Sequence, residues 1–281
     1  MRGLTSIEDM TKKEGELCLG VLSGIHWKTS PDIWEKLEEG FELIPEKLRL
    51  RIFTEEDREK FTSISPSFEL KLMRGQENIT VLELKDTSTD ELFGKEFNPL
   101  TKTLLAFRLL KAGGIFIDNI YAIEHGKLGR IIPPSEPDFL PEYEFSLDEI
   151  NNLVAILNKV KTVDFDKHSS FRMACTRFGR SYLDRFYEDK LVDLCIAFEA
   201  LLLKGEYKKS DIGMGQVIGL ACSMLLGKNN DERKMIKENI ELAFRRRNDV
   251  VHGKDFDFDQ IYTLIPNFED YLRRSIFHLI L

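Results

Sequence analysis

The stretch "LVDLCIAFEALLL", residues 191–203, is apolar on almost every side when it is wound as a helix. A helix that is hydrophobic all round belongs in the interior of a helical domain rather than on its surface. Only Asp193 and Glu199 interrupt this apolar surface. Because a carboxylate is costly to bury without a partner, we expect Glu199 either to meet a cation or to reach solvent through a gap in the packing.

Helical patterns continue on both sides of this stretch. Ser146 followed by Glu149 has the spacing of a capping box at a helix start. Helical spacing of apolar residues spans 146–161, 167–186, 188–205, 214–227, 231–251 and 266–281. These segments predict that residues 146–281 form an all-α bundle, the second of two domains.

Residues 1–145 carry a different pattern, which predicts an α+β domain. Alternating apolar and polar residues predict strands at 16–22, 47–53, 67–73, 79–85 and 114–126. One helix interrupts them: Asn98 can cap it, Pro99 suits its first position, and Gly113–Gly114 end it. Prolines cluster between residues 133 and 141, and we place the domain boundary near residue 145. The role of this first domain is open: a sensor, a partner-binding domain or an RNA-selecting domain.

The composition is that of a globular protein that does not cross a membrane. Of the 281 residues, 42% are hydrophobic and 31% charged, and no apolar run approaches the ~20 residues that a membrane-spanning helix needs. The polar, acid-containing start "MRGLTSIEDMTKKEGE" predicts neither a signal peptide nor a transit peptide. Cys18, Cys175, Cys195 and Cys222 are scattered and suit buried thiols in a reducing compartment, so we expect a cytoplasmic location.

The net charge of −8 argues against a nucleic-acid-binding protein, but the basic residues are unevenly distributed. Residues 233–254 hold seven basic side chains against three acidic ones. Such a basic island is compatible with a phosphate site and equally with a solvated helix face.

Arg247 is the informative residue of this island. At about 100° per residue, Arg247 falls in the middle of an apolar stripe of its helix, where a leucine would be expected. The apolar members of this stripe are Ile236, Ile240, Ala243, Phe244, Val250 and Val251. Arg245 and Arg246 lie off the stripe and are expected in solvent. A guanidinium on an apolar face must meet an acid, a carbonyl, a partner chain or an anion, so we expect Arg247 to meet Glu199 or a phosphate.

Asn248 and His252 follow in the same helix, which Gly253 is expected to end. Because they are four residues apart, the Asn248 amide could orient the His252 imidazole. His252 points about 140° away from Arg247 on an ideal helix. The two can therefore act on one phosphate only if the helix distorts near Val250 or if the site is built across a symmetric dimer.

The segment "RNDVVHG", residues 247–253, resembles the Arg-(polar)-x-x-x-His motif of the HEPN superfamily of nucleotide-binding domains. The upstream helices "FRMACTRFGRSYLDRF" and "EDKLVDLCIAFEALLL" resemble the Apea-like branch in particular, so that the resemblance covers about residues 165–281. It implies an all-α bundle that commonly forms homodimers, with the motifs of two protomers facing one cleft.

The same resemblance implies a metal-independent endoribonuclease of a defence or toxin–antitoxin type. Arg247 would stabilise the transition state at phosphorus, His252 would act as general acid or base, and Asn248 would orient the histidine or the substrate. Arg245, Arg246 and Lys254 would hold the RNA backbone, and Glu199 would support Arg247. No cofactor or metal is expected; the expected partners are RNA, a second copy of the chain and a cognate antitoxin or activator.

A second interpretation belongs to a different functional class. The domain could be a non-catalytic nucleotide- or protein-binding module in which Arg247 is a structural cation paired with Glu199. The two differ in geometry, because catalysis requires Arg247, Asn248 and His252 to converge on a solvent-reachable cleft.

Overall fold

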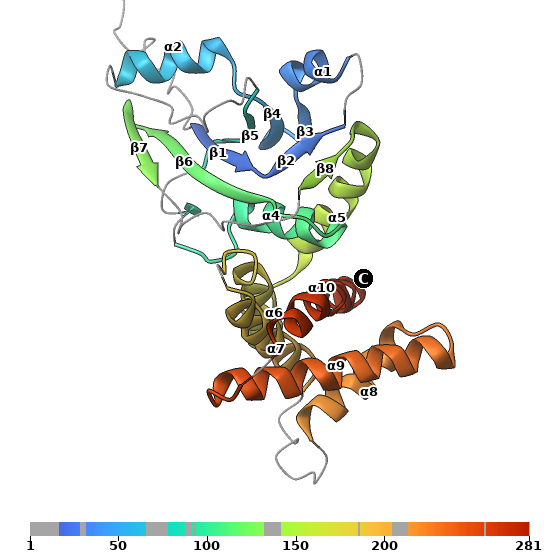
Figure 1. Cartoon of the computed structure of the whole chain (residues 1–281). Helices are drawn as coiled ribbons and strands as arrows, with labels where there is room; N and C mark the ends of the chain where they lie inside the picture. Colours follow the sequence, from blue (N-terminus) through green and yellow to red (C-terminus); the bar gives the residue numbers. More distant parts are fainter. Residues whose placement is uncertain are drawn as a thin grey trace, which may run out of the picture. The chain divides into compact units, whose positions relative to one another are not determined.

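The computed structural model describes residues 17–28, 32–65, 78–87, 91–92, 94–131, 142–184, 186–203, 213–255 and 257–280. The fold is mixed α+β, as the sequence predicts at this level (Figure 1). Contacts divide the chain into two compact units. The first comprises Met1–Leu22, Pro31–Asn98 and Ile117–Pro133, and the second comprises Ser23–Ser30, Pro99–Phe116 and Pro134–Leu281. This division differs from a single boundary near residue 145, because two segments from the first half of the sequence pack with the helices of the second.

The first unit is built on a six-stranded sheet with the order β3-β4-β5-β1-β6-β7. Its strands are β1 (Leu17–Ser23), β3 (Phe41–Ile44), β4 (Leu48–Ile52), β5 (Thr80–Lys85), β6 (Phe116–Glu124) and β7 (Lys127–Ile131). The neighbours β3–β4, β4–β5, β5–β1 and β6–β7 pair in antiparallel fashion. The strands expected at 16–22, 47–53, 79–85 and 114–126 are therefore confirmed, whereas the one expected at 67–73 lies outside the described residues.

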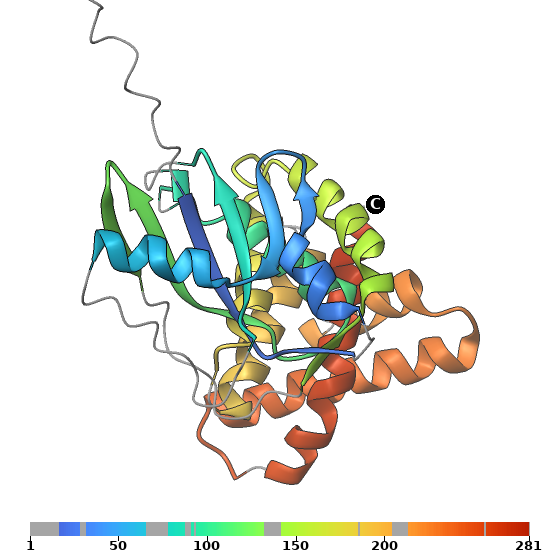
Figure 2. The same cartoon turned by 90° about the horizontal axis from the view of Figure 1, so that it is seen from above.

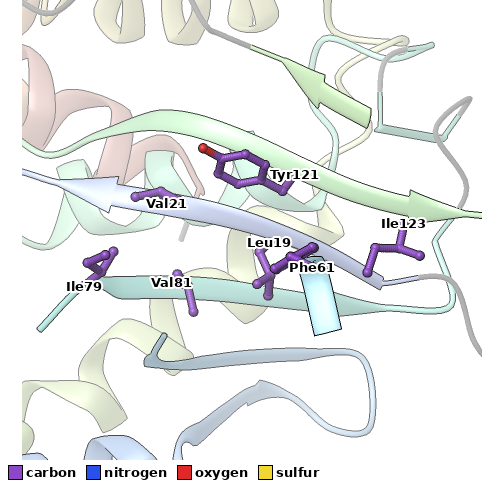
Figure 3. Close-up of a cluster of buried hydrophobic side chains, with 7 residues drawn as sticks. All are labelled: Leu19, Val21, Phe61, Ile79, Val81, Tyr121 and Ile123. Carbon is purple, nitrogen blue, oxygen red and sulfur yellow. The ribbon is translucent and has the colours of Figure 1, made fainter. Parts of the chain in front are cut away.

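Helix α2 (Glu55–Ile64) lies across one face of this sheet (Figure 2). Phe61 of α2 is fully buried in a cluster with strand side chains (Figure 3). The strand members of the cluster are Leu19, Val21, Val81, Tyr121 and Ile123, and Ile79 precedes β5. Alternate residues of a strand share a face, so these positions are the α2 face of the sheet. The short helix α1 (Ile33–Glu39) packs against β4.

The second unit consists mainly of helices. They are α4 (Pro99–Leu110), a short 3₁₀ helix η2 (Leu147–Glu149), α5 (Ile150–Thr162), α6 (Ser169–Arg180), α7 (Tyr187–Leu202), α8 (Met214–Leu226), α9 (Asn230–Val251) and α10 (Phe258–Ile280). The unit also contains a small parallel sheet of β2 (Ile25–Trp27) and β8 (Tyr143–Phe145). The capping pattern expected at Ser146 is present, because the Glu149 carboxylate accepts bonds from the Ser146 backbone N–H at 3.0 Å and from its hydroxyl at 3.1 Å.

Helix α7 occupies the position that its composition predicts. It packs against α6, α8, α9 and α10, and its side chains from Leu191 to Phe198 are largely buried. Asp193, one of the two acids that interrupt the apolar stretch 191–203, is buried and receives a bond from Arg177 Nη1 at 2.7 Å. The four cysteines are buried free thiols, as the sequence indicates.

Helix α10 corrects the expectation that the last helix begins at Pro266. It begins at Phe258 and continues through Pro266. A proline inside a helix removes one backbone hydrogen bond. Ile261, Leu264 and Ile265 are nevertheless buried immediately before it, and this burial offsets the loss. Within the described residues, no helix is both long and apolar enough to cross a membrane.

Candidate functional site

Helix α9 carries the residues that the sequence singles out. Its N-terminus is capped by Asn229, whose side-chain oxygen accepts a bond from the Glu232 N–H at 2.9 Å. Its C-terminus is followed by Gly253 at φ +62°, a conformation that favours glycine, as expected for the end of this helix. The apolar stripe is buried at Ile236, Ile240, Ala243 and Phe244.

The stripe does not continue to the end of the helix. Val251 is 53% exposed, so the last turn of α9 extends beyond the packing that covers the rest of the stripe. Arg247 lies between the buried and the exposed part, and its side chain is 24% exposed. The last turn is therefore accessible to a ligand or to another chain.

Arg247 meets Glu199, as the sequence indicates. Nη2 of Arg247 lies 3.8 Å from Oε1 of Glu199, and the Glu199 side chain is 25% exposed. This distance is that of an ion pair without a hydrogen bond. Arg247 Nε and Glu199 Oε1 are both buried atoms that lack a hydrogen-bond partner among the described residues. The guanidinium is thus held beside an acid, but its hydrogen-bonding capacity is only partly used.

The electrostatics of Glu199 agree with this loose pairing. Burial raises the pKa of the Glu199 carboxyl above its usual value, and the charge of Arg247 lowers it only in part. A close hydrogen-bonded pair would depress the pKa of a carboxyl. Burial also raises the pKa of the nearby Cys195 thiol well above its usual value, so Cys195 is not a nucleophile at neutral pH.

Asn248 differs from its expected arrangement. Its Oδ1 accepts a bond from Arg247 Nη1 at 3.2 Å. No bond between the Asn248 amide and His252 is present in the described structure, because the side-chain oxygen is turned toward the arginine. His252 is exposed at the C-cap of α9. Asn248 therefore positions Arg247, and His252 follows Arg247 by five residues, about 140° further round a regular helix.

The other basic residues differ in how firmly they are held. Arg245 is exposed. Arg246 is less free than expected, because Nε donates to Gln260 of α10 and Nη1 to Asp249 at 3.1 Å. Lys254 is exposed, with Nζ 3.8 Å from Asp249. Arg245 and Lys254 remain available to a phosphate, whereas Arg246 ties α9 to the start of α10.

The contact between α8 and α9 brings Gly213–Gly219 close to the site. Gly213 is the N-cap residue of α8. Gly219 is buried against the backbone of Lys237, where an added Cβ would lie 3.1 Å from the carbonyl oxygen. Gly219 thus permits a close approach between the two helices, which lets α8 run tightly along α9.

The sequence did not reveal an aromatic cluster in the same unit. Tyr187 at the start of α7 contacts Phe258 and Tyr262 of α10, with ring centroids 6.3 and 5.0 Å apart. A signal existed in "FDFD", residues 256–259, and "DRFY", residues 184–187, where aromatic side chains alternate with charged ones. Their proximity depends on packing between helices that are distant in the sequence.

Comparison with known proteins adds no independent assignment: no family model, curated protein or solved structure matches the chain.

Proposed function

We propose that the second unit is a HEPN-type helical bundle that cleaves RNA without a metal ion and acts as a homodimer. The observation that carries the proposal is Arg247. Its guanidinium is held at an accessible helix end by Glu199 and Asn248, its side chain is 24% exposed, and Nη2 makes only a 3.8 Å ion pair with Glu199. A preorganised cation with unused donors is suited to stabilise charge that develops on a phosphate.

The spacing of Arg247 and His252 supports the dimer in this proposal. His252 follows Arg247 by five residues, which is about 140° further round a regular helix, so we do not expect one protomer to assemble the pair. A two-fold axis near the end of α9 would bring two copies of Arg247 and His252 to one cleft. The exposed Val251 side chain is available for such a contact.

The proposed chemistry is intramolecular transfer at phosphorus. A general base removes the proton of an RNA 2′-OH, and the resulting oxygen attacks the adjacent phosphate. A general acid protonates the leaving 5′-oxygen, so the products are a cyclic phosphate and a 5′-hydroxyl end. His252 serves as acid or base, because an imidazole can both accept and donate a proton through its ring nitrogens. Arg245 and Lys254 hold the backbone of the RNA.

The proposed setting is a defence or toxin–antitoxin system in the cytoplasm, with an antitoxin or activator as partner. The resemblance of residues 165–281 to the Apea-like branch supports this setting.

A specific observation favours a second function. The Arg247–Glu199 pair and the Arg247–Asn248 bond also suit a non-catalytic binding module with a structural arginine. In that case Arg247 would contribute to stability and not to chemistry.

The test is cleavage of an end-labelled mixed-sequence RNA in EDTA by the full chain. The variants are His252→Ala and Arg247→Lys, with His278→Ala as the matched control, since His278 is also an exposed histidine in the last turn of a helix. We expect cyclic-phosphate ends from the wild type, about 100-fold slower cleavage by His252→Ala, and an unchanged rate for His278→Ala.

Two outcomes would contradict the proposal. If the wild type does not cleave RNA while it is shown to be dimeric, the binding module is the better assignment. If His252→Ala retains full activity, the catalytic site lies elsewhere. Circular dichroism of each variant separates a loss of catalytic activity from a loss of folding. Lysine is chosen at position 247 because it keeps a positive charge beside Glu199.

A further inference from the structure

The aromatic patch of the second unit consists of Phe186, Tyr187, Phe258 and Tyr262. Phe186 precedes α7 and is 63% exposed, whereas Phe258 and Tyr262 lie one turn apart on α10 and are 48% and 55% exposed. Tyr187 packs edge-on against Phe258 and Tyr262, with interplanar angles of 84° and 80°. Single exposed apolar residues are ordinary on a protein surface, but a group of neighbouring aromatic rings indicates a site of interaction.

Acidic side chains accompany these rings in both segments. Glu188 and Asp189 lie in the first turn of α7, and Asp259 lies in the first turn of α10. Asp255 and Asp257 are exposed immediately before α10. Aromatic residues alternate with acids at 255–259, and two aromatic residues are followed by two acids at 186–189.

The described basic residues of the two segments do not neutralise this charge. Lys190 is buried, and its Nζ is committed to Glu269 at 2.5 Å. Arg180 is paired with Asp193, and the exposed Lys254 offsets one of the carboxylates, so that the acids remain in excess. The patch therefore presents rings within a negative field.

Two of the neighbouring carboxylates also lack hydrogen-bond donors. Oδ2 of Asp184 and Oε2 of Glu188 are buried atoms without a partner among the described residues. Burial and the negative charge of Asp193 raise the pKa of Asp184 to about 6. These oxygens are too buried to bond a docked side chain, but a positive charge on the surface near them would reduce the repulsion.

We propose that the aromatic patch is a docking surface for a basic polypeptide segment of another protein. Arginine and lysine side chains lay their aliphatic stems and charged heads on aromatic faces, and their nitrogens pair with surrounding carboxylates. The inference is independent of ribonuclease activity, since none of these residues belongs to the site at the end of α9.

The charge of the patch selects this occupant over two others. RNA is disfavoured, because its phosphates would face at least five carboxylates, those of Glu188, Asp189, Asp255, Asp257 and Asp259. A second copy of the chain across a two-fold axis is disfavoured as well, because a self-complementary contact would place these acids against the same acids.

The experiment measures binding of a fluorescent synthetic peptide of about twelve residues, rich in arginine and lysine, to the full chain by anisotropy. The variants are Phe258→Ala/Tyr262→Ala and Asp189→Asn/Asp259→Asn. The matched control is Leu220→Ala/Met224→Ala, a pair of exposed apolar residues with the same spacing on α8. We expect each patch variant to weaken binding about 10-fold, the acid variant also to reduce its salt dependence, and the control to bind as the wild type does.

Several results would overturn the inference. One is peptide binding that the aromatic variant leaves unchanged, which indicates unspecific attraction to an acidic protein. Another is absence of binding to the wild type at millimolar peptide. Binding of single-stranded RNA that is lost in the aromatic variant would make the patch a base-stacking surface, and concentration-dependent self-association lost in that variant would make it a homodimer interface. Failure of the nuclease assay affects none of these readouts.

Discussion

At the scale of single residues, charge and burial oppose each other at several positions, and Asp184 shows the conflict most clearly. The pKa of its carboxyl is raised from 3.8 to about 6, by burial first and by Asp193 second. The folded state therefore binds more protons than the unfolded state between these two pH values. Stability that is fully present below about pH 4 is consequently lost as the pH rises through about 6.

Because the ionised Asp184 carboxylate destabilises the folded state, we predict that Asp184→Asn stabilises the protein at high pH. The amide keeps the shape of the side chain without its charge, so the free energy of unfolding at pH 8 should increase by about 1 kcal/mol, a value reduced for solvent screening. Near pH 4 the variant and the wild type should unfold alike. Urea denaturation at both pH values measures the difference, with the exposed Glu238→Gln as control. If Asp184→Asn changes the free energy of unfolding by the same amount at pH 4, the change results from packing and not from the charge of Asp184.

Arg51 illustrates the opposite case, a buried charge whose partners are well placed. It donates to Glu83 at 2.5 Å and makes two bonds to Asp57 at 2.5 and 2.8 Å, and all three residues are buried. The charge of Arg51 and bonds from Thr54 hold the pKa of Asp57 below its usual value, despite the burial of the carboxyl.

Removal of one side chain from the buried group of Arg51, Asp57 and Glu83 should strongly destabilise the folded state. We predict that Asp57→Ala lowers the free energy of unfolding by about 3–5 kcal/mol, because the arginine is left buried without its main partner. Glu55→Ala, which removes the exposed partner of Arg58 in the same helix, should cost less than about 1 kcal/mol. Chemical denaturation of the two variants compares them directly, and equal losses would contradict a special role for the buried group.

At the scale of helices and strands, close approach of α8 to α9 depends on glycine. A Cβ added at Gly215 would lie 2.8 Å from Cβ and 3.2 Å from Cγ of Phe244. Phe244 is a buried member of the apolar stripe of α9. In a helix, alanine is more favourable than glycine by about 1 kcal/mol. Inserting a methyl group into a tight contact, however, costs about 1–3 kcal/mol of stability.

We therefore predict that Gly215→Ala is destabilising by about 1 kcal/mol or more, against its helix propensity. The exposed Leu220→Ala in the same helix should change the free energy of unfolding by less than about 0.5 kcal/mol. Thermal denaturation followed by circular dichroism measures both. A Gly215→Ala chain that melts at a higher temperature would show that the two helices can separate without loss.

The elements that the sequence predicts correctly are those with a strong local signal. The apolar composition of residues 191–203 places α7 among other helices, and an arginine on an apolar stripe together with a glutamate on a buried helix predicts the Arg247–Glu199 pair. The three-residue strands β2 and β8 have too short a pattern to identify, and they pair across more than a hundred residues of sequence. Asn248 was paired with His252 by spacing alone, but its carboxamide reaches the guanidinium of the adjacent residue. The aromatic patch depends on contacts between α7 and α10, which local periodicity does not encode.

At the scale of the whole molecule, the interleaving of the two units determines which fragments can fold. Helix α4, which precedes residue 145, packs against α5 and α10 in the second unit. Arg108 of α4 donates to the Gly179 carbonyl at 2.9 Å, and its guanidinium lies 4.4 Å from the centre of the Tyr182 ring. Arg273 of α10 donates to the Leu109 carbonyl at 3.1 Å, near the C-terminal end of α4.

We accordingly predict that a fragment of residues 146–281 does not fold cooperatively. It lacks the buried α4 side chains Leu100, Leu105, Phe107 and Leu109. At about 1.5–3 kcal/mol for each, this loss is comparable to the whole stability of an ordinary domain. A fragment that begins at residue 99 retains α4 and should melt with a sharper transition, although it lacks β2. Circular dichroism and amide hydrogen exchange on both fragments and the full chain provide the comparison. If the fragment 146–281 melts as sharply as the full chain, the helices after residue 145 form an independent domain, and α4 is only an appendage to it.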